Sequence, residues 1–411
     1  MTDLGALPGA DNCSVATSIN AAGEIVGYSE NGAVDPLTGI RQIRAVLWKD
    51  GEITDLGTFG GNHSFVGSIN DRGQIAGAAL NAIPDPFSFY DQLLFPGFSN
   101  GTQTRAFLWE NGQMQDLGTL GGPDADAFRV NNHGQVIGPS YTNSTPNDTT
   151  KVPTVAPFLW TRERGMVDLG GLGGTSGAPT AINDQGQIIG QSNLAGDQTS
   201  DPFLWDDGKL IDLFTDTVGG NPITANAIND AGEIIGGGAF PNRVFDAYVW
   251  RNGVATDLGA LDGDCFSEAV AINSAGQIVG YSVSCDFSKQ RSFLWENGSM
   301  VDLNTLIPPN SDLQLVETIA INDRGEIAGD GVPSGCGGDA TCGRAYVLIP
   351  CGGDHAEPAG CNADVSQNSA ASINQGPTAV TPGSPAASEM MARVRARLSR
   401  RFKVTASQQR H

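Results

Sequence analysis

The feature that most constrains this chain is a motif of the form Ile-Asn-x-x-Gly-x-Ile-x-Gly, repeated at intervals of roughly 45 to 60 residues. The copies end at Gly27, Gly77, Gly138, Gly190, Gly236, Gly280 and Gly329. Each copy is followed by a short apolar run, which ends in Trp in all but the last, and most continue through a turn to Asp-Leu. Self-similarity at this period predicts a propeller, a solenoid or an array rather than a globular enzyme with a single site.

Each repeat contains four short strand signals. The first ends in the Ile-Asn of the motif, the second is its Gln/Glu-Ile-x-Gly part, the third resembles Phe107–Trp109, and the fourth contains Asp-Leu. Pairs such as Asn111-Gly112 join the third signal to the fourth, and such pairs are the strongest short indication of a hairpin. The third strand is apolar at successive positions, which indicates burial on both faces. We therefore predict an all-β, seven-bladed β-propeller of four-stranded blades, with a capped β-solenoid as the alternative.

The ends of the repeat region predict how the ring closes. Thr2–Gly5 reads as a lone fourth strand, whereas the last repeat stops after its third strand at Ala345–Ile349. The N-terminal strand would therefore complete the last blade. Met1 itself occupies a repeat position, so we expect the natural chain to begin upstream and to carry a secretion signal that this sequence lacks.

Composition and charge divide the chain into three parts. We predict a propeller over 1–350, a Cys-bracketed and disordered linker over 351–388, and a basic, helical tail over 389–411. Residues 1–388 carry 16 basic and 44 acidic side chains, a net charge of −28, which argues against nucleic acid as a partner. No apolar run approaches the ~18 residues of a membrane span.

Cysteines lie at the edges of the repeat pattern and not in its strands. They are Cys13, Cys265, Cys285, Cys336, Cys342, Cys351 and Cys361. Loop cysteines in a Gly-rich chain indicate disulfides and an extracellular or periplasmic location. Cys265 and Cys285 fall in adjacent loops and are expected to bridge. Cys13 is expected near Cys336 and Cys342, and Cys351 and Cys361 bracket a short segment. Spacing alone leaves the connectivity open.

The motifs Asp-Leu-Gly-Thr-Leu-Gly-Gly, Ile-Asn-x-x-Gly-Gln-Ile-x-Gly and Phe-Leu-Trp resemble those of the HAF-repeat family over about 350 residues. That family is named for a His-Ala-Phe triplet before Leu-Trp. Here the triplet appears as Arg105-Ala106-Phe107 and related forms, and its His is absent from every copy. The resemblance implies a secreted bacterial repeat protein, and it implies neither a reaction nor catalytic residues.

Function is expected on the face that carries the insertions, because length varies there. The longest insertion, about Ala78 to Thr104, holds the aromatic candidates for ligand contact, with burial against the blade rim as the alternative. These are Phe87, Phe89, Tyr90, Phe95 and Phe98. Loops of the same face carry further ligand candidates among their carboxylates, with solvated rim charges as the alternative. These are Asp124, Asp126, Asp262 and Asp264.

The motif turns also contain acidic residues, and these raise the question of a metal. They are Asp71, Asp184, Asp230 and Asp323. Calcium is the one cofactor considered, although turn geometry explains these residues and the ligand spacing of a calcium loop is missing. We predict no enzyme and no catalytic residues, but a secreted binding or adhesion module for a carbohydrate or surface protein. The alternative is a carbohydrate-active hydrolase or lyase that uses carboxylates of the insertion face.

Overall fold

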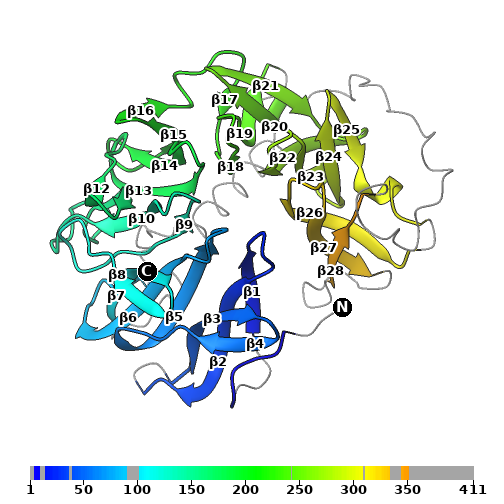
Figure 1. Cartoon of the computed structure of the whole chain (residues 1–411). Helices are drawn as coiled ribbons and strands as arrows, with labels where there is room; N and C mark the ends of the chain where they lie inside the picture. Colours follow the sequence, from blue (N-terminus) through cyan, green and yellow to red (C-terminus); the bar gives the residue numbers. More distant parts are fainter. Residues whose placement is uncertain are drawn as a thin grey trace, which may run out of the picture. The chain divides into compact units, whose positions relative to one another are not determined.

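The protein is described from a computed structural model that covers residues 4–9, 14–36, 39–89, 101–241, 243–308, 311–333 and 344–350 (Figure 1). In these residues the regular structure is strand, apart from one 3-10 turn, η1 (Leu303–Thr305). The chain divides into two compact units, one reaching to Ile211 and the other starting at Asp212, which we call unit 1 and unit 2. The all-β prediction is confirmed.

Unit 1 is a series of antiparallel sheets in which strands that follow one another in the chain lie side by side. The first sheet has the order β1 (Ser14–Ile19), β2 (Ile25–Val34), β3 (Arg41–Lys49), β4 (Glu52–Asp55). The second has the order β5 (Gly60–Ile69), β6 (Ile75–Pro84), β7 (Thr102–Glu110), β8 (Gln113–Asp116). The third contains β9 (Arg129–Val130), β10 (Val136–Tyr141), β11 (Val155–Thr161), β12 (Gly165–Asp168). The fourth contains β13 (Gly173–Ile182), β14 (Ile188–Leu194), β15 (Ser200–Asp206), β16 (Lys209–Asp212), and a single parallel pairing joins it to the third.

Unit 2 continues the same pattern. Its first sheet contains β17 (Asn221–Pro222), β18 (Ala227–Ile228), β19 (Ile234–Phe240), β20 (Arg243–Arg251), β21 (Val254–Gly259). The next has the order β22 (Asp264–Ile272), β23 (Ile278–Ser284), β24 (Gln290–Glu296), β25 (Ser299–Asp302). The last has three strands among the described residues, β26 (Leu313–Ile321), β27 (Ile327–Pro333), β28 (Arg344–Leu348).

The hairpins and the cores follow the predicted chemistry. Asn111 and Gly112 both have positive φ, 52° and 80°, as a two-residue hairpin with the twist of its strands requires. Gly77, the last residue of its motif, leaves no room for a side chain, because a Cβ there would lie 2.1 Å from the carbonyl oxygen of Phe65. The ring of the fully buried Phe107 covers this glycine. Apolar side chains of successive sheets then form the cores between them.

In five of the motifs the Asn does more than cap its own turn. The Asn70 carboxamide oxygen accepts the backbone N–H groups of Arg72 and Gln74, at 3.0 and 2.9 Å, as predicted. Its Nδ2 donates to the Gln74 side chain (2.8 Å) and to the backbone carbonyl of Asn131, the motif Asn of the next sheet (2.8 Å). The same bond between turns joins Asn20 to Asn70, Asn131 to Asn183, Asn229 to Asn273, and Asn273 to Asn322. We call this series the turn chain.

The N-terminal segment packs on the first sheet of unit 1. Leu4 and Leu7 contact the cluster of Val46 and Trp48, and the Trp48 indole N–H donates to the carbonyl of Gly5. Leu4 to Leu7 is not a strand, and the start of the predicted closing strand lies outside the described residues. The linker and the basic tail, 351–411, lie outside them as well.

Candidate functional site

The two described aromatic residues of the insertion face inward. Phe89 is 4% exposed and packs at 4.3 Å, centroid to centroid, against Tyr141, in a cluster with Val155 and the partly buried Phe87. The Tyr141 hydroxyl donates to the carbonyl of Phe87 (2.9 Å). The alternative of burial therefore holds for Phe89, whereas Phe87 is only partly buried and its contact with a ligand stays a prediction. Tyr90, Phe95 and Phe98 lie outside the described residues.

The neighbouring acidic candidates are also turned inward. Asp124 is fully buried, and its carboxylate accepts the backbone N–H groups of Phe89 (2.6 Å) and Thr104 (2.9 Å). The pKa of Asp124 is raised well above its usual range, mainly by burial and secondly by the charge of Asp85. Burial likewise raises the pKa of Asp126 to about 7. Asp124 therefore holds backbone in place and is not available to a ligand as a rim charge.

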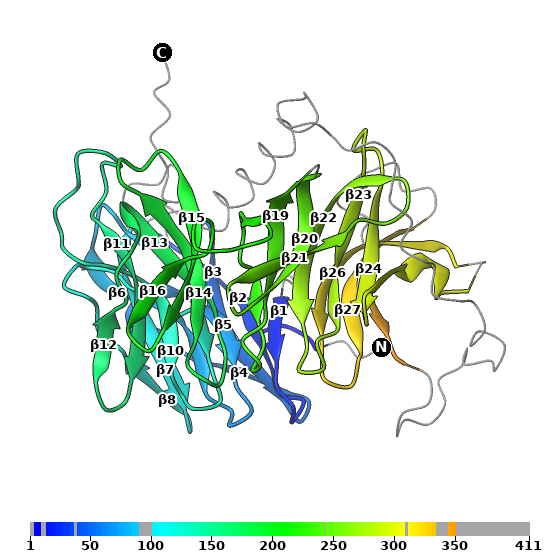
Figure 2. The same cartoon turned by 90° about the horizontal axis from the view of Figure 1, so that it is seen from above.

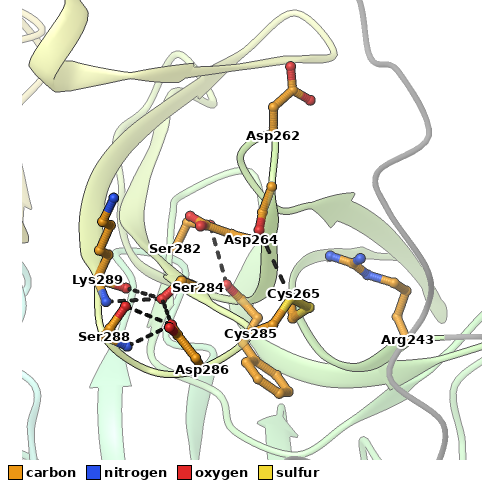
Figure 3. The surroundings of a disulfide bond; sticks show 12 residues. Arg243, Asp262, Asp264, Cys265, Ser282, Ser284, Cys285, Asp286, Ser288 and Lys289 are labelled. Atoms are coloured by element: carbon orange, nitrogen blue, oxygen red, sulfur yellow. Dashed lines mark hydrogen bonds between the residues drawn. A yellow bond between two sulfur atoms is a disulfide. The ribbon is translucent and has the colours of Figure 1, made fainter.

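Asp262 and Asp264 flank the disulfide of unit 2 (Figure 3). Cys265 and Cys285 are bonded, with their Cα atoms 4.8 Å apart, so the predicted pairing is confirmed. Asp264 is 5% exposed and forms an ion pair with Arg291 (2.8 Å), so it is not available to a ligand. Asp262 is exposed, as predicted for a rim charge. Cys13, Cys336, Cys342, Cys351 and Cys361 lie outside the described residues.

The acidic residues of the motif turns have structural partners. Asp71, Asp184 and Asp323 each accept a backbone N–H from the turn of the preceding repeat, at 2.8 Å. In the part of the chain that the structure describes, no group of three or more His, Cys, Asp or Glu residues could hold a metal ion. Calcium stays a prediction, and nothing in these turns requires it.

The candidate site richest in charged and polar side chains lies at the end of unit 1 that carries the motif turns and the hairpins between third and fourth strands. A pocket of about 570 Å³ opens there between the turns of three successive repeats. Its lining is polar and includes Arg72, Gln74, Glu110, His133, Gln135, Thr161, Arg162, Glu163, Asp184 and Gln185. Figure 2 shows the strands of unit 1 running side by side between two ends, so that such turns share one end.

Hydrogen bonds position Glu110 in this pocket. Its carboxylate accepts from Gln74 Nε2 (2.9 Å) and from Arg162 Nη2 (2.8 Å), so both of its oxygens are held in place. Arg72 Nη2 donates to Gln74 Oε1 (2.9 Å) and so orients the amide that holds Glu110. His133 and Glu163 are exposed on the pocket wall. A fixed carboxylate, a second carboxylate and an imidazole can transfer protons to and from a bound substrate.

Sequence reasoning missed this pocket because its residues come from different repeats. The signal was the repeat position. Glu110 directly precedes a hairpin Asn-Gly pair and His133 lies within a motif turn, and in a four-stranded antiparallel sheet these two kinds of turn lie at the same end. His63, the other histidine of the repeats, is instead buried in unit 1, where its Nε2 lies 3.0 Å from Asp35 Oδ2 and its Nδ1 accepts the backbone N–H of Ile43 (3.1 Å).

The His63 environment predicts an acid-side loss of stability. Burial lowers the pKa of His63 below its usual 6.5, because a charged ring would lose its hydration there, and this effect outweighs the opposite effect of Asp35. The ring would also have to release the Ile43 N–H to gain a second proton. The unfolded chain then binds this proton at a higher pH than the folded chain, so stability is complete above about 6.5 and falls as the pH drops. We expect His63→Gln, which cannot titrate, to weaken this dependence between pH 7.5 and 5 in urea denaturation. Equal pH dependence in both proteins would contradict the prediction.

No family model and no curated protein matches the sequence. Solved structures do match. One is of a prolyl endopeptidase, with a TM-score of 0.50 and 8% identity over 82% of this chain and 50% of that chain. A puromycin-hydrolysing peptidase of Mycobacterium tuberculosis has a TM-score of 0.47 and 10% identity, over 85% and 55%. A gluconolactonase of Xanthomonas campestris has a TM-score of 0.35 and 9% identity, over 83% and 88%. At such identities the likeness shows the fold alone.

These findings correct the predicted function. The inference from a repeat fold to a binding or adhesion module without enzymatic activity does not hold, because the structure that matches with a TM-score of 0.50 is of an enzyme, a prolyl endopeptidase, and the fold is therefore not specific to binding modules. Three side chains expected to contact a ligand, Phe89, Asp124 and Asp264, are also buried. The chain spans about half the length of the two peptidases. In the described part of the chain no helix is long and apolar enough to cross a membrane.

Proposed function

We propose that the protein is a hydrolase that cleaves a carbohydrate chain, with the polar pocket of unit 1 as its active site. The observation that carries this proposal is the set of groups that the pocket brings together. Gln74 and Arg162 hold the carboxylate of Glu110 in place, and Glu163 and His133 belong to the lining of the same pocket. Glycosidic bonds are cleaved by paired carboxylates, one of which gives a proton while the other stabilises positive charge or activates water.

The rest of the lining supports a polyhydroxylated substrate. Gln135 and Gln185 add carboxamides to the lining, and Arg72 and Thr161 add a guanidinium and a hydroxyl, so the wall offers both donors and acceptors. Sugar hydroxyls both donate and accept, and such a wall can satisfy them. Glu110, whose two oxygens already accept hydrogen bonds, is assigned the stabilisation of positive charge, and Glu163, which is exposed, is assigned the proton transfer.

The proposal predicts a large loss of activity in two variants. In a screen of polysaccharides and oligosaccharides, we expect Glu110→Gln and Glu163→Gln each to lower kcat by about 10²- to 10⁴-fold, the usual contribution of general acid–base catalysis. Release of reducing ends measures the rate. Glu52→Gln is the matched control, because Glu52 is an exposed glutamate outside the pocket, at a hairpin of the first sheet.

Two outcomes would overturn the proposal. Carbohydrate cleavage that survives both pocket variants would place the active site elsewhere. Cleavage of peptides, but of no glycan, would replace the substrate class, and a panel of peptide substrates therefore belongs in the same screen.

We propose in addition that the protein is secreted, with support from the Cys265–Cys285 disulfide, which is typical of oxidising compartments. Membership of the HAF-repeat family, the seven-bladed arrangement and its closure by the N-terminal strand stay predictions.

A further inference from the structure

Two equivalent positions between successive sheets of unit 1 carry different acid–base pairs. Asp35 and Asp85 each follow the second strand of their sheet and precede a proline. His63 and Asp124 each stand seven residues before the Asn of their motif, Asn70 and Asn131. The interface between the first and second sheets therefore pairs Asp35 with His63, and the next interface pairs Asp85 with Asp124.

In the first pair, Asp35 and His63, the hydrogen bonds show which atom carries the proton between the two side chains. His63 Nδ1 accepts the backbone N–H of Ile43, which leaves the ring proton on Nε2, where it is donated to Asp35 Oδ2 (3.0 Å). Both residues are buried, at 0% and 3% exposure. A single proton on the histidine thus joins the two side chains across the interface.

The second pair keeps the equivalent backbone N–H donor, but it consists of two carboxylates and has no histidine N–H between them. Asp124 Oδ1 accepts the backbone N–H of Thr104, which is the counterpart of Ile43, and Asp124 Oδ2 accepts that of Phe89. Asp85 Oδ1 accepts the N–H of Phe87 (3.0 Å). Asp85 Oδ2, the counterpart of the Asp35 oxygen that His63 contacts, is buried without a hydrogen-bond partner.

Two ionised carboxylates would repel each other strongly at this buried position, where no positive charge of the described residues compensates them. Asp85 and Asp124 are 5% and 0% exposed, and no described Lys or Arg forms an ion pair with either. Arg105, the cation nearest in sequence, pairs with Asp116 and contacts only the Pro123 carbonyl on this side. The other titratable group facing the pair is Tyr141, whose hydroxyl is donated to Phe87. Adjacent buried carboxylates share a proton in such surroundings.

We propose that Asp85 and Asp124 bind one proton between them, carried on Asp85 Oδ2, and that this shared proton fastens the root of the insertion to the third sheet. Both oxygens of Asp124 already accept N–H groups, so the proton sits on the oxygen of Asp85 that has no donor. The segment it fastens begins at Asp85 and includes Phe87 and Phe89, which pack on Tyr141.

The pKa of Asp124 is raised, first by burial and then by the charge of Asp85, which agrees with one proton held by the pair. The sign of the pH effect follows from it. The folded pair keeps a proton that unfolded aspartates lose near pH 3.9, so stability decreases as the pH rises above that value, until the folded pair also loses its proton. Above that point the root of the insertion detaches, because two buried negative charges repel.

The test compares urea denaturation midpoints between pH 5 and pH 9. Asp85→Asn supplies an N–H in place of the shared proton, and we expect it to remove one proton from the pH dependence and to exceed the wild-type midpoint at pH 8 and above. Asp124→Asn can accept only one of the two backbone N–H groups, so we expect a lower midpoint at every pH. Asp148→Asn, an exposed loop residue of unit 1, is the matched control and should follow the wild type.

Carbon-13 spectra of labelled aspartate report the same event directly. We expect one wild-type aspartate signal to titrate well above the usual range and to disappear in Asp85→Asn. Loss of stability in Asp85→Asn equal to that in Asp124→Asn would overturn the proposal. So would a wild-type midpoint that rises with calcium chloride and falls with chelator while Asp85→Asn is unaffected, because the pair would then hold a cation.

Discussion

Replacing Asn70 by alanine is expected to lower the free energy of unfolding by about 4 kcal/mol, since four hydrogen bonds of roughly 1 kcal/mol each are lost. The side chain is 5% exposed and uses both its oxygen and its nitrogen, within the turn and across to the next sheet. Urea denaturation followed by circular dichroism measures the loss.

Two comparison variants separate the link between turns from the turn itself. Asn70→Asp keeps an acceptor for the Arg72 and Gln74 N–H groups but cannot donate to Asn131, so we expect it to lose a substantial part of the same free energy. Gln185→Ala changes an exposed residue of an equivalent turn, and it should fall within about 0.5 kcal/mol of the wild type. Wild-type stability in Asn70→Asp would show that the bond between turns contributes nothing.

Gly77→Ala is expected to destabilise the protein by about 3 kcal/mol or more, through overpacking. The new methyl group would lie 2.1 Å from the Phe65 carbonyl oxygen and 2.6 Å from Phe107 Cζ, and neither can move without opening the second sheet. The backbone of Gly77 needs no unusual φ, so the cost comes from lack of space. The urea midpoint and the yield of folded protein are the measurements.

Gly112→Ala is the matched comparison for this prediction, because Gly77 is required by lack of space and Gly112 by its backbone conformation. Gly112 has a φ of +80° and open space around its Cβ position, so alanine there incurs about 1 to 2 kcal/mol of backbone strain and no clash. A greater loss in Gly112→Ala than in Gly77→Ala would contradict the packing argument.

Much of the fold was predictable because its causes are local. The Asn111-Gly112 hairpin, the strand order within each sheet and the all-β class follow from signals a few residues apart. The Cys265–Cys285 bridge was predictable because the two cysteines belong to the same end of one repeat, although Cys265 lies at the start of β22 and not in a loop as expected. What failed was the direction of side chains in the insertion, since an aromatic loop has the same composition whether Phe89 is exposed or buried.

The pocket and the turn chain could not be predicted for a different reason. Each depends on contacts between repeats, such as Arg162 with Glu110 or Asn70 with Asn131, across some 50 to 60 residues of sequence. A motif shows that positions are equivalent, but not that one copy binds the next. The structure was also needed to compare two pairs of side chains at equivalent interfaces between sheets, Asp35–His63 and Asp85–Asp124.

The turn chain also has a polarity. In every described link the side-chain amide of one motif donates to the backbone carbonyl of the motif that follows it in the chain, as Asn20 does to Asn70 and Asn229 to Asn273. Successive sheets of a unit therefore associate head to tail, through two different surfaces, as subunits do in a heterologous assembly. Such a contact leaves a donor on one side and an acceptor on the other, so a duplicated repeat can be inserted between two others without new chemistry at either junction.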